Sequence, residues 1–159
     1  MITEIYHASP ARNPSFMQQR QDLEKDKNGH VFPVAGTITY DNDSVNQISI
    51  NRRIAIHEMA YILGLVSVNS GFFDSATSTY KAKSHAGWAY GELLGTYRQT
   101  AIPMIGKEYW DYIDFPNEAL NASAGPPNGL VSQMTIAALR DIGWNVNYGA
   151  ADDYLLPVR

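Results

Sequence analysis

The 159-residue sequence contains no cysteine, which excludes disulfide bonds and thiolate metal ligands. It also contains no apolar run approaching the ~18 residues that a membrane span requires, so no membrane helix is expected. Neither sign of charge is in large excess. The net charge of −4 gives no electrostatic basis for binding nucleic acid or an anionic membrane surface.

The first residues lack both the basic segment and the apolar segment of a secretion signal. We therefore expect no secretion signal and no pro-segment, and a protein that lies in the cytoplasm or is incorporated in a multi-protein particle. The sequence also lacks a phosphate-binding glycine loop, a nucleophile elbow and an internal repeat. Its 45% apolar and 18% charged residues are typical of a single globular domain.

Local patterns predict the secondary structure on either side of a central apolar stretch. Residues 18–27 favour a short exposed helix, and the alternation of apolar and polar residues from His30 predicts a strand that ends at an acidic turn, residues 41–44. Further along, residues 84–94 are predicted to form a helix that ends at Gly95. Another helix is predicted to be capped by Ser132 and to end at Gly143.

The longest stretch with helical apolar spacing is ISINRRIAIHEMAYILGL, residues 48–65. Apolar residues occupy most of its positions, so this helix is predicted to be buried nearly all round. Ser49 or Asn51 is a candidate N-cap, and Gly64 lies near the end. The pair His57-Glu58 lies in the middle, where buried polar side chains need hydrogen-bonding partners or a function.

This pair matches the first half of the zinc-peptidase motif H-E-x-x-H. In that motif two histidines one helical turn apart bind one metal ion, and the glutamate acts as general base. Here the frame reads HEMAY, and Tyr61 stands where the second histidine would be. A neutral phenol, with a pKa near ~10, replaces imidazole poorly as a zinc ligand. Taken alone, the pair favours a core histidine with satisfied hydrogen bonds over a metal ligand.

Five segments, in the same order, resemble the leishmanolysin-like branch of the metzincin zinc peptidases. PVAGTITYD (residues 33–41) resembles the strand before their active-site helix, and IAIHEMAYILGL (54–65) resembles their VILHEMGHVLGI. AIPM (101–104) resembles their AVPVE segment. YWDYIDFPNEALNA (109–122) resembles HWRE followed by FGNELMTG, and residues 130–157 resemble their closing helix and tail.

The resemblance implies an α+β fold: a truncated metzincin-like (zincin) domain with a small sheet, a buried helix of the active-site type and a C-terminal helical subdomain. Residues 1–159 then form a single domain. Within it, residues 1–30 are an N-terminal extension, residues 31–66 supply the strand and the central helix, and residues 67–159 form the C-terminal subdomain.

The departures from the family pattern fall on its chemistry. The resemblance makes His57 the first zinc ligand and Glu58 the general base, whereas Tyr61, Tyr109 and Leu120 replace the second ligand, the third ligand and the turn methionine. A catalytic zinc site normally uses three protein ligands and a water. We therefore expect His57 and Glu58 to be vestigial, no cofactor to be bound, and the chain to be a pseudopeptidase that acts as a structural or protein-binding module.

The replacements also suggest how the former site is filled. If the fold is retained, positions 57, 61 and 109 converge, and two phenol rings occupy the space of the metal and its imidazoles. Such rings prefer stacked or edge-to-face contact, and their hydroxyls can bond to His57 or Glu58. The sequence thus predicts an aromatic, hydrogen-bonded plug in which the Tyr61 and Tyr109 rings lie within ~7 Å of each other.

The segment before the central helix is short and holds one clear strand, so its sheet needs cover along an open edge. This cover comes either from the first thirty residues or from another chain. We favour another chain, as a protein partner or by self-assembly, in a larger assembly such as a phage particle.

Two alternatives stay open. In one, the chain is a zinc metallopeptidase with a rearranged site, in which His57 is joined by a phenolate of Tyr61 or Tyr109, or by Asp111 or Asp114. In the other, the match reflects ancestry alone and the binding site is unrelated. Its expected place is the cleft beneath the predicted strand, where an extended peptide would lie along Gly36, Thr37, Ile38 and Thr39.

Overall fold

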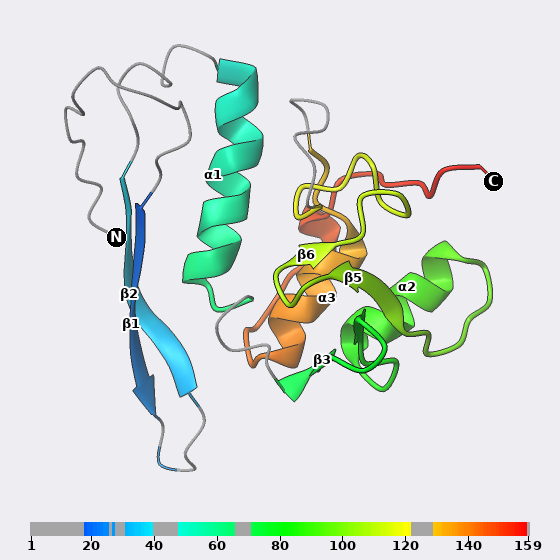
Figure 1. Cartoon of the computed structure of the whole chain (residues 1–159), viewed down its shortest axis with the longest axis horizontal. Coiled ribbons are helices and arrows are strands. Elements are labelled where there is room, and N and C mark those ends of the chain that lie inside the picture. Colours follow the sequence, from blue (N-terminus) through cyan, green and yellow to red (C-terminus); the bar gives the residue numbers. More distant parts are fainter. Residues whose placement is uncertain are drawn as a thin grey trace.

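The computed structural model describes residues 18–25, 27, 31–39, 48–65, 71–121 and 129–158. These residues form a mixed α+β structure with a two-stranded and a four-stranded antiparallel sheet. Helix α1 (Ile48–Ile62) stands between the two-stranded sheet and the part of the chain that holds the other helices and the second sheet (Figure 1). The acidic turn expected at residues 41–44 lies outside the described residues.

The two-stranded sheet pairs β1 (Gln18–Lys25) with β2 (Val31–Thr39). The exposed helix expected at residues 18–27 was therefore a wrong prediction, because pairing with β2 overrides the helical preference of the segment. The register shifts between Asp22 and Leu23, which face Ala35 and Pro33. Proline has no N–H that could donate a hydrogen bond to the neighbouring strand. The bulge therefore interrupts the ladder at a place where one bond is already missing. One edge of β2 is thus covered by the first thirty residues, as one of the two sequence alternatives proposed.

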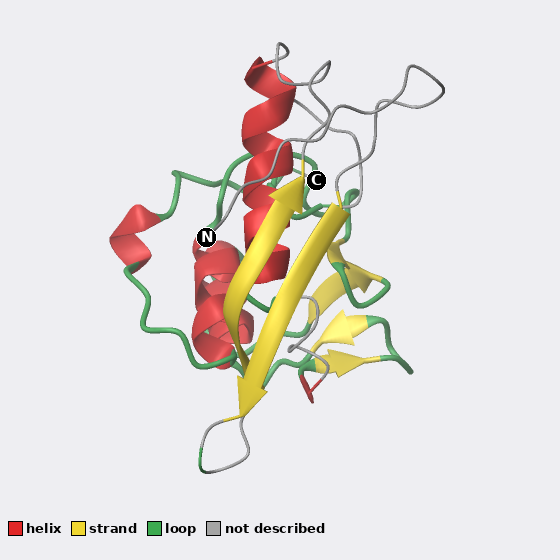
Figure 2. Cartoon of the chain, turned by 90° about the vertical axis from the view of Figure 1, so that its left-hand side faces the viewer, coloured by secondary structure: helices red, strands yellow, loops and turns green. Residues whose placement is uncertain are grey.

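Helix α1 runs along one face of this sheet (Figure 2). It begins before Ser49 and Asn51, so neither residue is the predicted N-cap. Gly64 adopts a φ of 95°, which ends the helix as expected. The helix is less buried than its sequence predicts, since Met59 is 38% exposed. The sheet covers one side of α1 and the C-terminal part lies on another (Figure 1), so the helix is not enclosed all round.

Close contact between α1 and β2 depends on Gly36. A Cβ atom at this position would overlap the side chain of Ile62, the last residue of α1. Both residues are buried. The absence of a side chain at Gly36 therefore sets how closely the helix packs on the sheet.

The second sheet is built from very short strands in sequential order. Its strands are β3 (Phe73–Asp74), β4 (Thr79–Tyr80), β5 (Ile102–Ile105) and β6 (Tyr109–Trp110). Tyr80 of β4 has no exposed surface, stacks on Phe72 and meets the Trp110 ring edge to face. This sheet joins the core and carries Tyr109 on its last strand.

Two helices form the rest of the core, and their predicted ends are confirmed. Helix α2 (His85–Leu93) is capped by Ser84 and followed by Gly95 with a φ of 68°. Helix α3 (Gln133–Asp141) is capped by Ser132 and followed by Gly143 with a φ of 104°. The two helices pack on each other, and the tail continues through a 3-10 turn, η2 (Tyr148–Ala150). No helix in the described ranges is long and apolar enough to cross a membrane.

Candidate functional site

The site predicted from the sequence is centred on His57 of α1 and Tyr109 of β6. Their rings stack, with centroids 5.1 Å apart and planes inclined by 14°. The two residues come from different elements and are far apart in the sequence, yet both are only partly buried. The fold thus brings one predicted ligand position into ring contact with another.

Glu58 is the next residue on α1, and its charge acts on Tyr109. It is 7% exposed, and its Oε2 atom has no hydrogen-bond partner within the described structure. Burial raises the pKa of Glu58 from 4.5 to about 7, because a carboxylate loses its hydration there. The predicted bond from a tyrosine hydroxyl to Glu58 is therefore not formed at Oε2. Near neutral pH this side chain is divided between its charged and neutral forms.

The pKa of Tyr109 is raised as well. Burial is the main cause, and the negative charges of Glu108 and then of Glu58 add to it. Each of these effects disfavours the phenolate. Tyr109 therefore remains a neutral phenol under physiological conditions.

Tyr61 and Leu120 are the other two positions that the sequence singled out. Tyr61 follows His57 by about one helical turn on α1 and is partly buried. Leu120 is buried in the core, and its carbonyl accepts a hydrogen bond of 3.0 Å from the N–H of Trp110, the neighbour of Tyr109. The chain at Leu120 thus runs beside the strand that carries Tyr109. The predicted approach of the Tyr61 and Tyr109 rings stays a prediction.

The predicted cleft strand is β2. Gly36 lies against Ile62 at the end of α1, and Thr37 is partly buried. In the ladder, Ile38 and Thr39 pair with Gln19 and Gln18 of β1. One edge of the strand is therefore occupied by β1 rather than open to a peptide.

The donor atoms at this centre do not fit a three-ligand zinc site. In the described part of the chain, no group of three or more histidine, aspartate or glutamate side chains could hold a metal ion. Imidazole lone pairs lie in the ring plane, whereas His57 presents a ring face to Tyr109. Asp111, an alternative ligand, accepts a hydrogen bond of 2.7 Å from the N–H of Ile113 in its own turn. No catalytic step through zinc follows from this arrangement.

Sequence reasoning missed a buried carboxylate, that of Glu118. It has no exposed surface and accepts hydrogen bonds from the N–H of Leu120 at 2.6 Å, the N–H of Ser132 at 3.1 Å and the hydroxyls of Ser132 and Thr135. Burial raises its pKa, and these hydrogen bonds oppose the shift. Glu118 joins the loop after β6 to the start of α3. Its partners Ser132 and Thr135 follow 14 and 17 residues later in the chain, and only they distinguish it from an ordinary surface glutamate.

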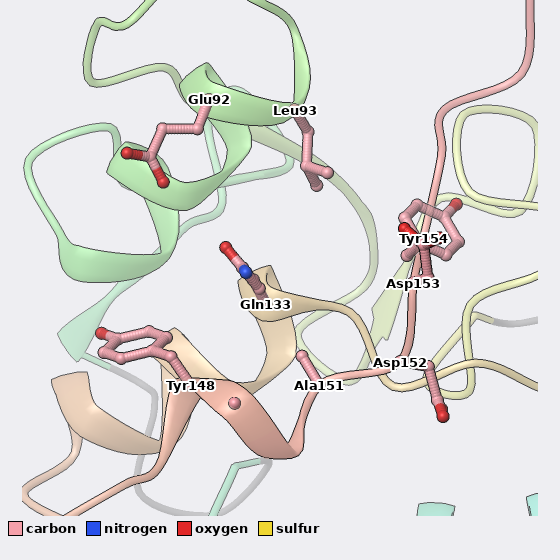
Figure 3. A pocket seen from close by; sticks show the side chains of 9 residues that line it. Glu92, Leu93, Gln133, Tyr148, Ala151, Asp152, Asp153 and Tyr154 are labelled. Atoms are coloured by element: carbon pink, nitrogen blue, oxygen red, sulfur yellow. The ribbon is translucent and has the colours of Figure 1, made fainter.

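A separate surface pocket of about 440 Å³ lies between α2, α3 and the C-terminal tail (Figure 3). The side chains of Glu92 and Gln133 face it from the two helices, and Tyr148 of η2 lies along its floor. Asp152, at its rim, instead accepts a hydrogen bond of 2.8 Å from the N–H of Val131. The sequence carried no signal for this pocket, because its lining comes from three separate segments.

Comparison of the chain with protein-family models, curated proteins and solved structures found no significant match. The case for a function therefore depends on the residues of the site and on their arrangement.

Proposed function

We propose that the chain is a non-catalytic, metzincin-like domain that acts as a structural or protein-binding module, as a component of a larger assembly such as a phage particle. The observation that carries this proposal is the stack of His57 on Tyr109. The resemblance assigns these two positions to zinc ligands, so the fold it implies requires them to lie together. Their ring-to-ring contact favours an aromatic plug over a metal centre.

The chemistry of Glu58 supports the loss of catalysis. A zinc peptidase needs a metal to lower the pKa of its water from ~15.7 to near 7. With one histidine, a phenol and no third ligand among the described residues, Glu58 would have no activated water to deprotonate.

The alternative, a zinc peptidase with a rearranged site, requires a tyrosine phenolate or an aspartate as a ligand. The raised pKa of Tyr109 opposes the phenolate. Asp111 has its Oδ1 in a local turn with Ile113. Both observations weigh against this alternative.

The two-stranded sheet supports the binding role. Isolated pairs of strands are marginally stable in water, and helix α1 packs on one face of this pair. Val34 at the bulge is 48% exposed. A protein partner or a further copy of the chain that extends the sheet would stabilise it by adding a ladder of hydrogen bonds.

Zinc content tests the proposal directly. Protein purified without chelator is incubated with zinc, dialysed and analysed by mass spectrometry for metal, with His57→Ala as a matched control. We expect no retained zinc and no difference between the two proteins. Near-stoichiometric zinc that disappears in His57→Ala would favour the peptidase, and peptide cleavage abolished by Glu58→Gln would establish it.

A further inference from the structure

The two-stranded sheet has one outer edge on each of its strands. Among the described residues β1 pairs only with β2, so the other edge of β1 takes no part in a ladder there. Figure 2 shows the two strands from the side away from α1. An edge strand exposes a row of N–H and C=O groups that can pair with another strand. The edge of β1 is therefore a place where a further strand can extend the sheet.

The two edges differ in how well they can pair. β2 contains Pro33, which has no N–H, and Val34, which has no counterpart in β1. Proline and bulges are features that protect an edge from further pairing. β1 contains no proline or glycine and no extra residue from Gln18 to Lys25. A regular ladder is thus compatible with the edge of β1 rather than with that of β2.

The charges along β1 favour a second copy of the same strand as the partner. Its sequence is QQRQDLEK, in which Arg20 and Asp22 are two residues apart. Residues two apart belong to the same face of a strand, and opposite charges that face each other across two strands are favourable. If two β1 strands pair antiparallel about a twofold axis through Gln21, position 20 of each copy stands opposite position 22 of the other.

Other registers of the symmetric pairing place like charges opposite each other. An axis through Arg20 or through Asp22 puts that residue opposite its own copy. An axis through Leu23 puts Asp22 opposite Glu24. Like charges directly opposite each other are destabilising, and an axis nearer either end of the strand pairs few residues. In the register centred on Gln21 no two like charges face each other, so charge complementarity selects this register.

We propose that the chain forms a symmetric dimer in which the β1 strands of two copies pair antiparallel, centred on Gln21, into one four-stranded sheet. This inference rests on the proposed function, because it names the partner that extends the sheet of the module. Twofold symmetry gives both copies the same contacts, so the pair of Arg20 and Asp22 occurs twice. The added ladder also stabilises two strands that are marginal as an isolated pair.

The test is sedimentation velocity of the full chain over a range of protein concentrations, with the zinc content of the same samples measured. We expect zinc-free protein to reach the mass of two chains. Arg20→Asp and Asp22→Arg each place two pairs of like charges in this register, so each should raise the dissociation constant of the dimer about tenfold or more. Asp153→Arg, at an exposed residue of the C-terminal tail, is the matched control and should leave the constant unchanged.

A mixture of the two variants distinguishes a lost charge pair from a misfolded chain. Arg20→Asp chains carry two acidic residues at these positions and Asp22→Arg chains carry two basic ones. Only a dimer with one chain of each kind has opposite charges at both contacts, so mixing should restore association. The double variant Arg20→Asp/Asp22→Arg exchanges the two charges and should dimerise on its own.

Wild-type protein that stays monomeric would overturn the inference, and this is the result expected if residues 1–17 or a different protein occupy the edge of β1. Dimers that persist in both single variants would overturn it as well, since the chains would then associate elsewhere. So would a folded double variant that stays monomeric. Each of these results leaves the zinc-free module intact, whereas retained zinc that disappears in His57→Ala would overturn the proposed function.

Discussion

The carboxylate of Asp141, the last residue of α3, accepts a hydrogen bond of 3.1 Å from the hydroxyl of the fully buried Tyr80. The same carboxylate accepts bonds from the backbone N–H groups of His85 at 2.7 Å and Ala86 at 3.1 Å, at the start of α2. A negative charge is favourable at a helix N-terminus. Asp141 therefore ties β4, α2 and α3 together at one point.

Replacement of Asp141 by alanine is expected to lower the free energy of unfolding by about 2–4 kcal/mol, because three donors lose their acceptor. Urea unfolding followed by circular dichroism measures the change. Tyr80→Phe removes one of the three bonds and should cost less. Asp153→Asn, at an exposed residue, serves as the control. A loss below 1 kcal/mol in Asp141→Ala, on the order of a surface substitution, would contradict this role.

Glu118→Ala is expected to destabilise the fold more strongly, by about 3–5 kcal/mol, because it leaves the donors of Leu120, Ser132 and Thr135 buried without an acceptor. Glu118→Gln keeps the shape and one acceptor oxygen, so its loss should be smaller. Thermal unfolding of both variants shows which of the two loses more stability. The reverse order would contradict this account, because it would mean that the NH2 group of glutamine, placed against these donors, costs more than the loss of both acceptor oxygens.

The stability of the protein should depend on pH through Glu58. Its pKa is about 7 in the folded chain and 4.5 ordinarily, so the folded state binds the proton more tightly. The stabilisation is complete below pH 4.5 and is lost as the pH rises through 7. After allowance for solvent screening, the change is about 2 kcal/mol.

Urea unfolding midpoints between pH 5 and pH 8 test this dependence, with zinc-free protein throughout. Glu58→Gln should remove the share of the pH dependence of the unfolding midpoint that Glu58 contributes. Glu24→Gln should show the same pH dependence as the wild type. Parallel profiles for wild type and Glu58→Gln would assign the pH dependence to another group, such as Glu118, whose pKa is also raised.

Gly36→Ala should destabilise the contact between α1 and β2 by about 1–3 kcal/mol, since the new methyl group overlaps Ile62. Gly71→Ala is a matched control, because a Cβ there meets no atom within 4 Å. In a double-mutant cycle, Ile62→Ala should relieve part of the cost of Gly36→Ala. Additive effects would show that the two positions do not press on each other.

The resemblance makes a prediction of its own. If positions 57, 61 and 109 keep the geometry of a zinc site, the double variant Tyr61→His/Tyr109→His should retain near-stoichiometric zinc after dialysis, whereas each single variant should retain less. Metal analysis and the zinc dependence of thermal unfolding measure this gain. A folded double variant without zinc would count against the assignment of these positions.

Local chemistry made several elements of the fold predictable. Ser84 and Ser132 cap α2 and α3, and glycines with positive φ follow both helices, because a cap and a left-handed turn depend on neighbouring residues alone. The β1 segment shows the opposite case. Its residues favour a helix, but pairing with β2 gives hydrogen bonds that only the assembled sheet provides.

In the candidate site, too, some features were predictable from the sequence and others depend on the tertiary structure. The sequence by itself determined that His57 and Glu58 share one turn of an apolar helix and that tyrosines stand at two positions of the motif, because spacing along a helix fixes which side chains are neighbours. Only the tertiary structure decided that Tyr109 stacks on His57, that Glu58 keeps an unpaired oxygen, and that Glu118 and Asp141 hold distant segments together. These relationships arise when separate elements pack, since burial removes water and leaves each polar group dependent on whichever partners the fold brings to it.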